Sequence, residues 1–220
     1  MAGETSEETG GLGATTRAYR VLERLIVTLE LPPATTTTEG ALIERIGLGR
    51  TPVREAIQRL AWEGLIEVRP RAGLAIAPLR ADDWLLVVDA RRGVEAVLAR
   101  AAARNMTAGA AGQLGDAAQA MNRAVIAGNV IAFLEADKLL DEIMADAAEN
   151  PFAARVAAPL QTHSRRFWYR FQSDSGLAQS AGHHVDLIAA ILDGDERHAE
   201  MEADRLMTML RQLAEQAARR

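Results

Sequence analysis

Two arginines four residues apart, Arg50 and Arg54, are the side chains in this sequence best suited to reading nucleic acid. Residues four apart share one face of a helix, and an arginine fork can pair with guanine O6 and N7 or clamp a phosphate. The opposite face would be buried by four apolar residues at helical spacing, Val53, Ala56, Ile57 and Leu60. Both guanidinium groups are then expected to point outward from the first turn of a helix, where a recognition helix presents them to base edges.

The surrounding pattern separates a reading helix from an ordinary solvated helix with surface arginines. A helix is expected over residues 16–30, and a second one follows the N-cap Thr38 and stops at Gly47. The third helix is expected to take Thr51 as its N-cap, with Pro52 in the first helical position. Thr51 could then offer its hydroxyl or amide to a phosphate. This order of elements favours a helix-turn-helix.

A short β-hairpin is predicted directly after the third helix. Residues 65–69 partly alternate as a strand does, residues 70–73 carry a turn signal, and residues 74–77 form a second short apolar run. Arg69 and Arg71 put positive charge on this hairpin. It could therefore lie along a DNA backbone or minor groove as a wing.

A second group of polar residues lies in the later half of the chain. Asp137 and Asp141 are four apart and share one predicted helix face, and His184 lies in a later helix. Arg91 and Glu95 are also four apart. The two aspartates and the histidine are candidates for the polar wall of a pocket.

The stretch richest in aromatic and charged residues in this half is a further candidate. It contains His163, Arg165, Arg166, Phe167, Trp168, Tyr169 and Arg170. His163 and Arg166 could line a ligand cavity. The alternative, which the pattern favours, is that Phe167 and Trp168 belong to the core while the arginines extend outward to solvent.

Beyond Arg80, the part of the chain that carries these polar residues is predicted to be entirely helical. Six helical stretches without any strand signal are expected at residues 82–104, 108–127, 130–149, 151–171, 177–192 and 195–218. They predict an all-α bundle of about six helices. The expected fold class is therefore mainly α, with an N-terminal winged helix-turn-helix.

Composition supports this division. Aromatic residues make up only 4% of the chain, which favours helix over sheet. The lack of cysteine excludes a disulfide framework and a thiolate zinc site. The net charge is -5, but residues 14–80 hold ten arginines against seven glutamates. Positive charge is thus concentrated in the segment expected to meet phosphates.

Three segments are expected: a disordered tail at residues 1–14, a DNA-binding domain at 15–79 and a helical domain at 80–220. No stretch approaches the roughly 20 apolar residues that a membrane span requires. The first residues also lack the basic and apolar regions of a secretory signal. We expect a cytoplasmic protein without a membrane partner.

The segment from Gly47 to Leu60, GLGRTPVREAIQRL, with EGLIEVRP after it and Gly73 beyond, resembles the DNA-binding domain of the GntR family. The helical half resembles the effector-binding (FCD) domain of the FadR-type branch. The resemblance implies a homodimeric transcription regulator, expected to be a repressor, on double-stranded DNA with an inverted repeat. A small metabolite in the helical domain would control its DNA affinity. The implied DNA contacts are Arg50, Thr51, Pro52, Arg54 and the wing around Gly73.

Two positions depart from the pattern of the GntR family. Gly49 stands where that family usually has Ser or Thr, so one hydroxyl for a phosphate is missing. Gly40 stands where a basic residue is often found. Both predict weaker or differently specified DNA binding.

The resemblance also gives Arg91 and Glu95 a role, because they match an Arg and a Glu on the first helix of FadR-type effector domains. The arginine there commonly faces the pocket, and a carboxylate effector would suit it. The alternative is a salt pair at the helix surface.

Many FadR-type domains hold a divalent metal with an Asp, a His four residues later and one His on each of the last two helices. Asp137 matches the first ligand, Asp141 replaces the first His, and His184 matches the next. The last ligand position is Leu206, which cannot coordinate. Asp137, Asp141 and His184 could still hold one harder divalent ion with waters. The alternative is a polar pocket without a metal, in which the two aspartates are solvated or bonded to an arginine.

A metal-dependent enzyme on a helical bundle is the competing function. Such sites use paired Glu-x-x-His motifs on facing helices, and the sequence contains none. No nucleophile with an adjacent base stands out either. An architectural DNA binder without an effector is a third possibility, against which the long second half argues. We therefore expect a metabolite-responsive regulator and no enzyme.

Overall fold

Two compact units make up the part of the chain that the computed structural model describes, which is residues 13–71, 73–172 and 176–219. The first unit runs up to Ile26 and resumes at Leu31–Ala77. The second unit comprises Val27–Glu30 and the chain from Pro78 onward. The tail expected at residues 1–14 lies almost entirely outside the described residues, since helix α1 already begins at Ala14.

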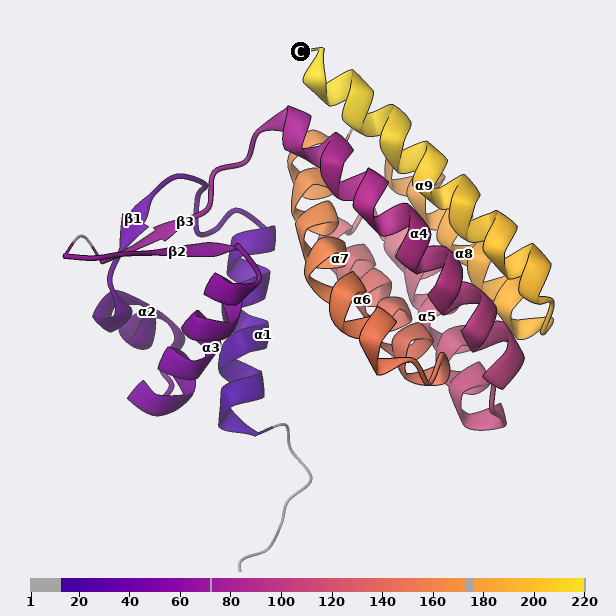
Figure 1. Cartoon of the computed structure of the whole chain (residues 1–220), viewed down its shortest axis with the longest axis horizontal. Coiled ribbons are helices and arrows are strands. Elements are labelled where there is room, and N and C mark those ends of the chain that lie inside the picture. Colours follow the sequence, from indigo (N-terminus) through magenta and orange to yellow (C-terminus); the bar gives the residue numbers. More distant parts are fainter. Residues whose placement is uncertain (1–12, 72, 173–175, 220) are drawn as a thin grey trace, which may run out of the picture. The chain divides into compact units, whose positions relative to one another are not determined.

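Three helices form the first unit: α1 (Ala14–Val27), α2 (Glu39–Ile46) and α3 (Arg50–Trp62) (Figure 1). The predicted apolar stripe of α3 is buried at all four positions, Val53, Ala56, Ile57 and Leu60. It packs in one core with apolar residues of α1, α2 and the sheet. The three helices predicted here are confirmed, although α1 ends three residues before the expected boundary.

The sheet of the first unit has the strand order β1-β3-β2 and is antiparallel. It consists of β1 (Thr36–Thr37), β2 (Ile66–Arg69) and β3 (Gly73–Ile76). The hairpin β2–β3 is the predicted wing, whereas β1 was not expected. Gly73 lies where β1 meets the wing, at φ +83, and a Cβ there would be 2.8 Å from the carbonyl oxygen of Thr37. Only glycine fits this approach of two backbones without strain.

The N-cap of α2 is the residue predicted from the sequence, whereas the N-cap of α3 is not. Thr38 caps α2 by accepting a hydrogen bond from the amide of Ala41 at 3.1 Å, and Gly47 ends the helix at φ +66, both as predicted. The prediction of Thr51 as the cap of α3 was wrong. The helix begins at Arg50 with Gly49 as N-cap, because the chain already turns into helical geometry two residues earlier. Pro52 is thus still within the first turn, where proline is tolerated.

Six helices form the described part of the second unit. They are α4 (Ala81–Asn105), α5 (Ala108–Ala127), α6 (Val130–Ala147), α7 (Pro151–Phe171), α8 (Gly176–Leu192) and α9 (Glu196–Ala218). Their number and bounds agree closely with the six predicted stretches, so the all-α bundle is confirmed. Among the residues described, no helix combines the length and apolar character needed to cross a membrane.

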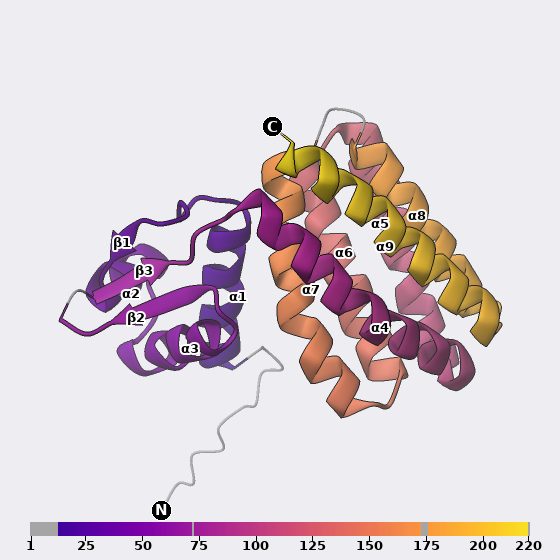
Figure 2. The ribbon, with the colours of Figure 1, turned by 45° about the horizontal axis from the view of Figure 1, so that its top comes forward.

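Helices α4 and α9 run antiparallel and side by side along the bundle (Figures 1 and 2). Ion pairs join them across the surface, among them Arg92 with Asp204 and Arg104 with Glu196. Inside the bundle, the ring of Trp84 on α4 stacks on Phe167 of α7, with centroids 6.0 Å apart. These contacts hold α4, α7 and α9 together around the polar residues of the interior.

Candidate functional site

The reading face predicted on α3 is exposed in the structure. Arg50, Thr51 and Arg54, within the first five residues of α3, are all exposed, while the apolar stripe on the other side of the helix is buried. Gly49 supplies no side-chain hydrogen bond to the start of the helix. The first amides of a helix without such a cap can bind an oxygen of a phosphate.

Glu39, the first residue of α2, binds the guanidinium of Arg54. Arg54 Nε donates to both carboxylate oxygens of Glu39 at 3.1 Å, and Nη2 donates to Oε1 at 2.8 Å. The hydrogen bond from Arg54 and the charges of Arg54 and Arg50 lower the pKa of Glu39, so it is a carboxylate at neutral pH. The pair fixes the direction of the arginine that was predicted to read bases.

This contact leaves part of Arg54 free. A guanidinium has five N–H donors, and Glu39 occupies those on the Nε–Nη2 edge. The Nη1–Nη2 edge can still present two parallel N–H groups, as a bidentate contact with guanine requires. This role of Glu39 was not predicted from the sequence, because its partner lies 15 residues away on another helix.

The wing carries its positive charge at the turn. Arg71 is exposed and has φ +64. Arg69 is paired with Glu67 at 2.7 Å, which offsets much of its charge. Within the described residues Arg71 makes no ion pair, so it is the wing arginine most available to a phosphate.

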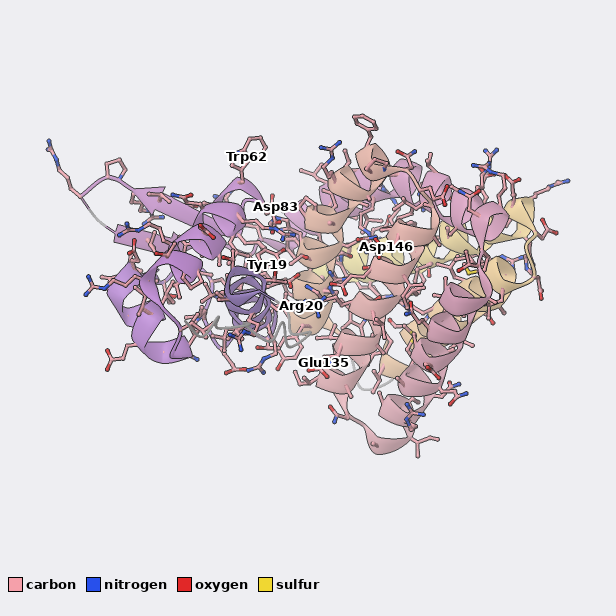
Figure 3. All side chains as sticks on the ribbon, turned by 90° about the horizontal axis from the view of Figure 1, so that it is seen from below. Tyr19, Arg20, Trp62, Asp83, Glu135 and Asp146 are labelled. Carbon is pink, nitrogen blue, oxygen red and sulfur yellow. The ribbon has the colours of Figure 1, made fainter. Side chains whose placement is uncertain are left out.

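Trp62, at the end of α3, was not singled out from the sequence. Its side chain projects away from the first unit (Figure 3) and the residue is 94% exposed. An isolated aromatic residue in a helical sequence does not show whether it faces the core or solvent. The structure places Trp62 on the surface at the end of the predicted reading helix.

A small cavity lies among the helices of the second unit. Its volume is about 20 Å³, enough for roughly one water molecule. The lining combines aromatic and aliphatic side chains with charged ones: Arg91, Phe133, Leu134, Asp137, Ser164, Arg165, Trp168, Ser180, His184 and Leu210. Three residues predicted to bind an effector, Arg91, Asp137 and His184, thus meet at one cavity.

Arg91 and Glu95 form a salt pair that is buried rather than exposed. Arg91 Nε and Nη2 donate to Glu95 Oε1 at 2.8 and 2.7 Å, and the two side chains are only 6% and 3% exposed. Gln161 Nε2 donates to the same carboxylate oxygen at 3.1 Å. Of the two alternatives for Arg91, a position at the pocket or a surface pair with Glu95, the structure shows Arg91 in the cavity wall and a pair that is buried.

The carboxylates Asp137 and Asp141 both meet Arg165 of α7. Arg165 Nη1 lies 3.4 Å from Asp137 Oδ2 and donates to Asp141 Oδ2. Of the two arrangements left open for these aspartates without a metal, the structure shows the bond to an arginine. Phe167 and Trp168 are buried as expected.

The expectation that the arginines of this stretch extend outward was wrong for two of them. Arg165 is 7% exposed and Arg166 is fully buried. Burial lowers the pKa of Arg166 to about 10. Arg165 stays inside because two acids of α6 neutralise it, a partnership between helices that local hydrophobicity does not reveal. His163 is half-buried, and neither it nor Arg166 belongs to the described lining of the cavity.

His184 bridges a backbone oxygen and a carboxylate. Its Nδ1 lies 2.6 Å from the carbonyl oxygen of Ser180, and its Nε2 lies 2.7 Å from Asp137 Oδ1. Both ring nitrogens therefore face acceptors, and the imidazolium donates to both. Burial alone would lower the pKa of His184, but the charge and hydrogen bond of Asp137 raise it.

The two aspartates titrate in opposite directions. Burial would raise the pKa of Asp137, but the cations His184 and Arg165 hold it well below its usual range. For Asp141, burial and the neighbouring charge of Asp137 raise the pKa to about 7, against the opposing effect of Arg165. One of two like charges in a buried site is commonly the harder to ionise.

The predicted divalent metal does not fit this arrangement. No group of three or more His, Cys, Asp or Glu side chains in the described part of the chain could hold a metal ion. Both oxygens of Asp137 and Oδ2 of Asp141 are paired with Arg165 or His184. Leu206, at the position of the last ligand, is a core residue that is 3% exposed.

Comparisons with known proteins bear on both units. Residues 14–76 match the family described as "Bacterial regulatory proteins, gntR family". Residues 86–219, more than half of the chain, match the FCD domain. The chain belongs to the GntR-family transcription regulators that carry an FCD effector-binding domain.

Individual relatives of this GntR-family regulator span nearly its whole length. The HTH-type transcriptional repressor RspR of Escherichia coli (strain K12) is 27% identical over 208 residues, 90% of this chain and 89% of that protein. The probable D-xylose utilization operon transcriptional repressor of Paenarthrobacter nicotinovorans is 28% identical over 192 residues, 86% of this chain and 84% of that one. The structure of E. coli McbR/YncC shares the fold, with a TM-score of 0.79 at 17% identity over 94% of this chain and 99% of the other.

Proposed function

We propose that this GntR-family regulator is a repressor of the FadR-type branch that binds an inverted-repeat operator as a homodimer. A small carboxylate metabolite bound in its FCD domain changes the affinity for DNA. The observation that carries the DNA half of this proposal is the exposed pair Arg50 and Arg54 on the first turn of α3, above a fully buried stripe. A twofold dimer matches the symmetry of an inverted repeat.

Four kinds of contact with DNA are proposed for each DNA-binding unit of the dimer. Arg54, oriented by Glu39, pairs with a base through its Nη1–Nη2 edge. Arg50 reaches a base edge or phosphate beside it. Thr51, with Pro52 packed in the same turn, offers its hydroxyl and amide to a phosphate. The wing contributes Arg71 and the backbone around Gly73.

The effector half of the proposal rests on the cations around the cavity. Arg91, Arg165 and His184 line it beside a single carboxylate, Asp137, so the lining has a positive excess. An anionic group would gain charge-assisted hydrogen bonds there. The apolar lining from Phe133 and Leu210 suits a short aliphatic portion.

The small volume of the cavity suggests how an effector could act. A cavity of about 20 Å³ cannot hold a metabolite, so binding requires the surrounding helices to move apart. A ligand that binds only the widened form shifts the protein toward that form. The coupling between effector binding and DNA binding would then be limited by how much the free energy of operator binding differs between the two forms.

Selection of binding sites from random double-stranded DNA, followed by fluorescence anisotropy on the selected site, tests the DNA half. The expected result is an inverted repeat, with Arg54→Ala losing preference at one base pair in each half. Gln58→Ala, an exposed change further along α3, is the matched control and should leave the profile unchanged. Selection of no sequence by folded, dimeric protein would refute the proposal.

Thermal unfolding with a panel of mono- and dicarboxylates of two to six carbons tests the effector half. A binding carboxylate should raise the Tm and change operator affinity in the same concentration range. Arg91→Lys, which retains the charge but loses the fork, should weaken that response. Stabilisation only by neutral or cationic metabolites would contradict the anionic effector.

A further inference from the structure

The acid pair Asp137 and Asp141 already has a cation between its two members. Arg165 extends from α7 to α6, where Nη1 lies 3.4 Å from Asp137 Oδ2 and donates to Asp141 Oδ2. Nη2 donates to Thr162 Oγ1 at 3.2 Å. All three charged side chains are less than a tenth exposed. The guanidinium is therefore held in place by hydrogen bonds on two of its nitrogens.

Most of the atoms that could coordinate an ion are taken up by this arrangement. Asp137 Oδ1 bonds to His184, and its Oδ2 faces Arg165. Asp141 Oδ2 accepts from Arg165. His184 Nδ1 is bonded to the carbonyl of Ser180, so its remaining nitrogen is the one that faces Asp137. A divalent ion at this position would have to displace a buried guanidinium, because two cations at such short range repel each other strongly.

Charge balance explains why a cation is required here. Two carboxylates buried side by side without a counter-ion would be strongly destabilising. A divalent ion is one solution, and an arginine from a facing helix is another.

We propose that the Arg165 guanidinium is the resident cation of this site, so that the FCD domain of this chain assembles its polar interior without a metal ion. Arginine keeps its charge at all accessible pH values and cannot be removed by a chelator. It also offers N–H donors where an ion would offer open coordination positions. Given the proposed effector function, a ligand here is recognised by hydrogen bonds from Arg91 and Arg165, which line the cavity, and needs no chelating pair of oxygens.

Metal content and thermal unfolding of the full chain test this assignment. Wild-type protein is purified without added metal, then measured with EDTA and with Zn²⁺, Mn²⁺ or Ni²⁺. The expected result is far less than one ion per chain and an unchanged Tm in all conditions. One tightly held ion per chain, with a Tm that falls on chelation, would overturn the proposal.

Substitution of Arg165 gives the complementary experiment. Arg165→Met keeps the stem and removes the charge, and should lower the Tm by roughly 6 to 20 °C, as expected for breaking a buried ion pair in a chain of this size. Added Mn²⁺ or Zn²⁺ should restore part of the loss, because the carboxylates then lack a cation. Arg165→Lys, which retains the charge, should show no such response to metal.

A second variant keeps the test decisive if Arg165→Met does not fold. Adding Asp137→Asn and Asp141→Asn to Arg165→Met removes the charges that need a cation, and the triple variant should be more stable than Arg165→Met alone. A triple variant no more stable than the single one would show that Arg165 does not serve the acids. A regulator that binds its operator but responds to no carboxylate would defeat the proposed effector and leave this result unaffected.

Discussion

Replacing Gly73 with alanine tests whether the close approach of β1 to the wing determines the geometry of the DNA-binding unit. Gly73 has φ +83, and an added Cβ would lie 2.8 Å from the carbonyl oxygen of Thr37. Both the backbone angle and the contact oppose a side chain. Gly73→Ala should therefore destabilise the unit and displace the wing together.

The size of the effect follows from these two contributions. A left-handed backbone costs a residue with a Cβ about 1–2 kcal/mol. The contact with Thr37 lies on backbone and cannot be relieved by a rotamer change, so β1 must shift, and forced overpacking typically costs about 1–3 kcal/mol. The expected loss of unfolding free energy is about 2–5 kcal/mol. This is a large fraction of the 5–15 kcal/mol, roughly, by which most domains are stable.

Urea unfolding and operator binding, measured on the same samples, provide the assay. Gly47→Ala is the matched control, because Gly47 is also left-handed at φ +66 but an added Cβ there would have nothing within 4 Å. The difference between the two variants isolates the contact with Thr37. Equal losses of stability would refute the reasoning, and so would an operator affinity that is unchanged in Gly73→Ala.

Three further predictions concern charge. Glu39→Gln should weaken the preference at the base pair read by Arg54, by a factor within the roughly 5- to 150-fold range of a bidentate contact. Competition between operator variants measures this preference. An unchanged preference would rule out an orienting role for Glu39. Gly40→Arg adds a cation in the first turn of α2, where an added Cβ would meet only Thr38 Oγ1 at 3.9 Å. It should tighten operator binding and steepen the salt dependence of that binding by about one counterion. An unchanged salt slope would count against a phosphate at that position. Because the pKa of Asp141 is raised to about 7, its contribution to stability is present at low pH and lost as pH rises from about 4 through 7. Relative to Asp141→Asn, wild-type protein should lose stability over that interval by up to about 1.4 kcal/mol per pH unit, and parallel pH profiles of the two proteins would contradict this.

The sequence predicted those parts of the fold that depend on local periodicity. The buried stripe of α3 and the six later helices follow from apolar spacing, and Thr38 follows from the hydroxyl that α2 needs at its start. Strand β1 was not predicted because its two residues are too few to show the alternating pattern of a strand. The start of α3 was misplaced because Gly49, which has no capping side chain, takes the N-cap position.

Several residues of the candidate site could be predicted from the sequence, but the pairs that they form could not. Spacing brought out Asp137, and the resemblance to FadR-type domains brought out His184; the structure places Asp137 Oδ1 2.7 Å from His184 Nε2. Arg165 was read as an outward arginine because helical periodicity cannot tell a buried cation from one that reaches solvent. Its partners lie 24 and 28 residues away, a relation that only the packing of α6 against α7 creates. Glu39 was missed for the same reason.

The small volume of the cavity beside His184 also has a kinetic consequence for the proposed effector binding. With room for about one water molecule in about 20 Å³, the cavity must widen before the proposed effector can bind. The apparent affinity is then the intrinsic affinity reduced by the small fraction of molecules that are open. Stopped-flow association should show an observed rate that levels off with ligand concentration at the rate of opening. The rate at which such a regulator responds to a change in effector concentration would thus be limited by the opening of the helical bundle and not by diffusion.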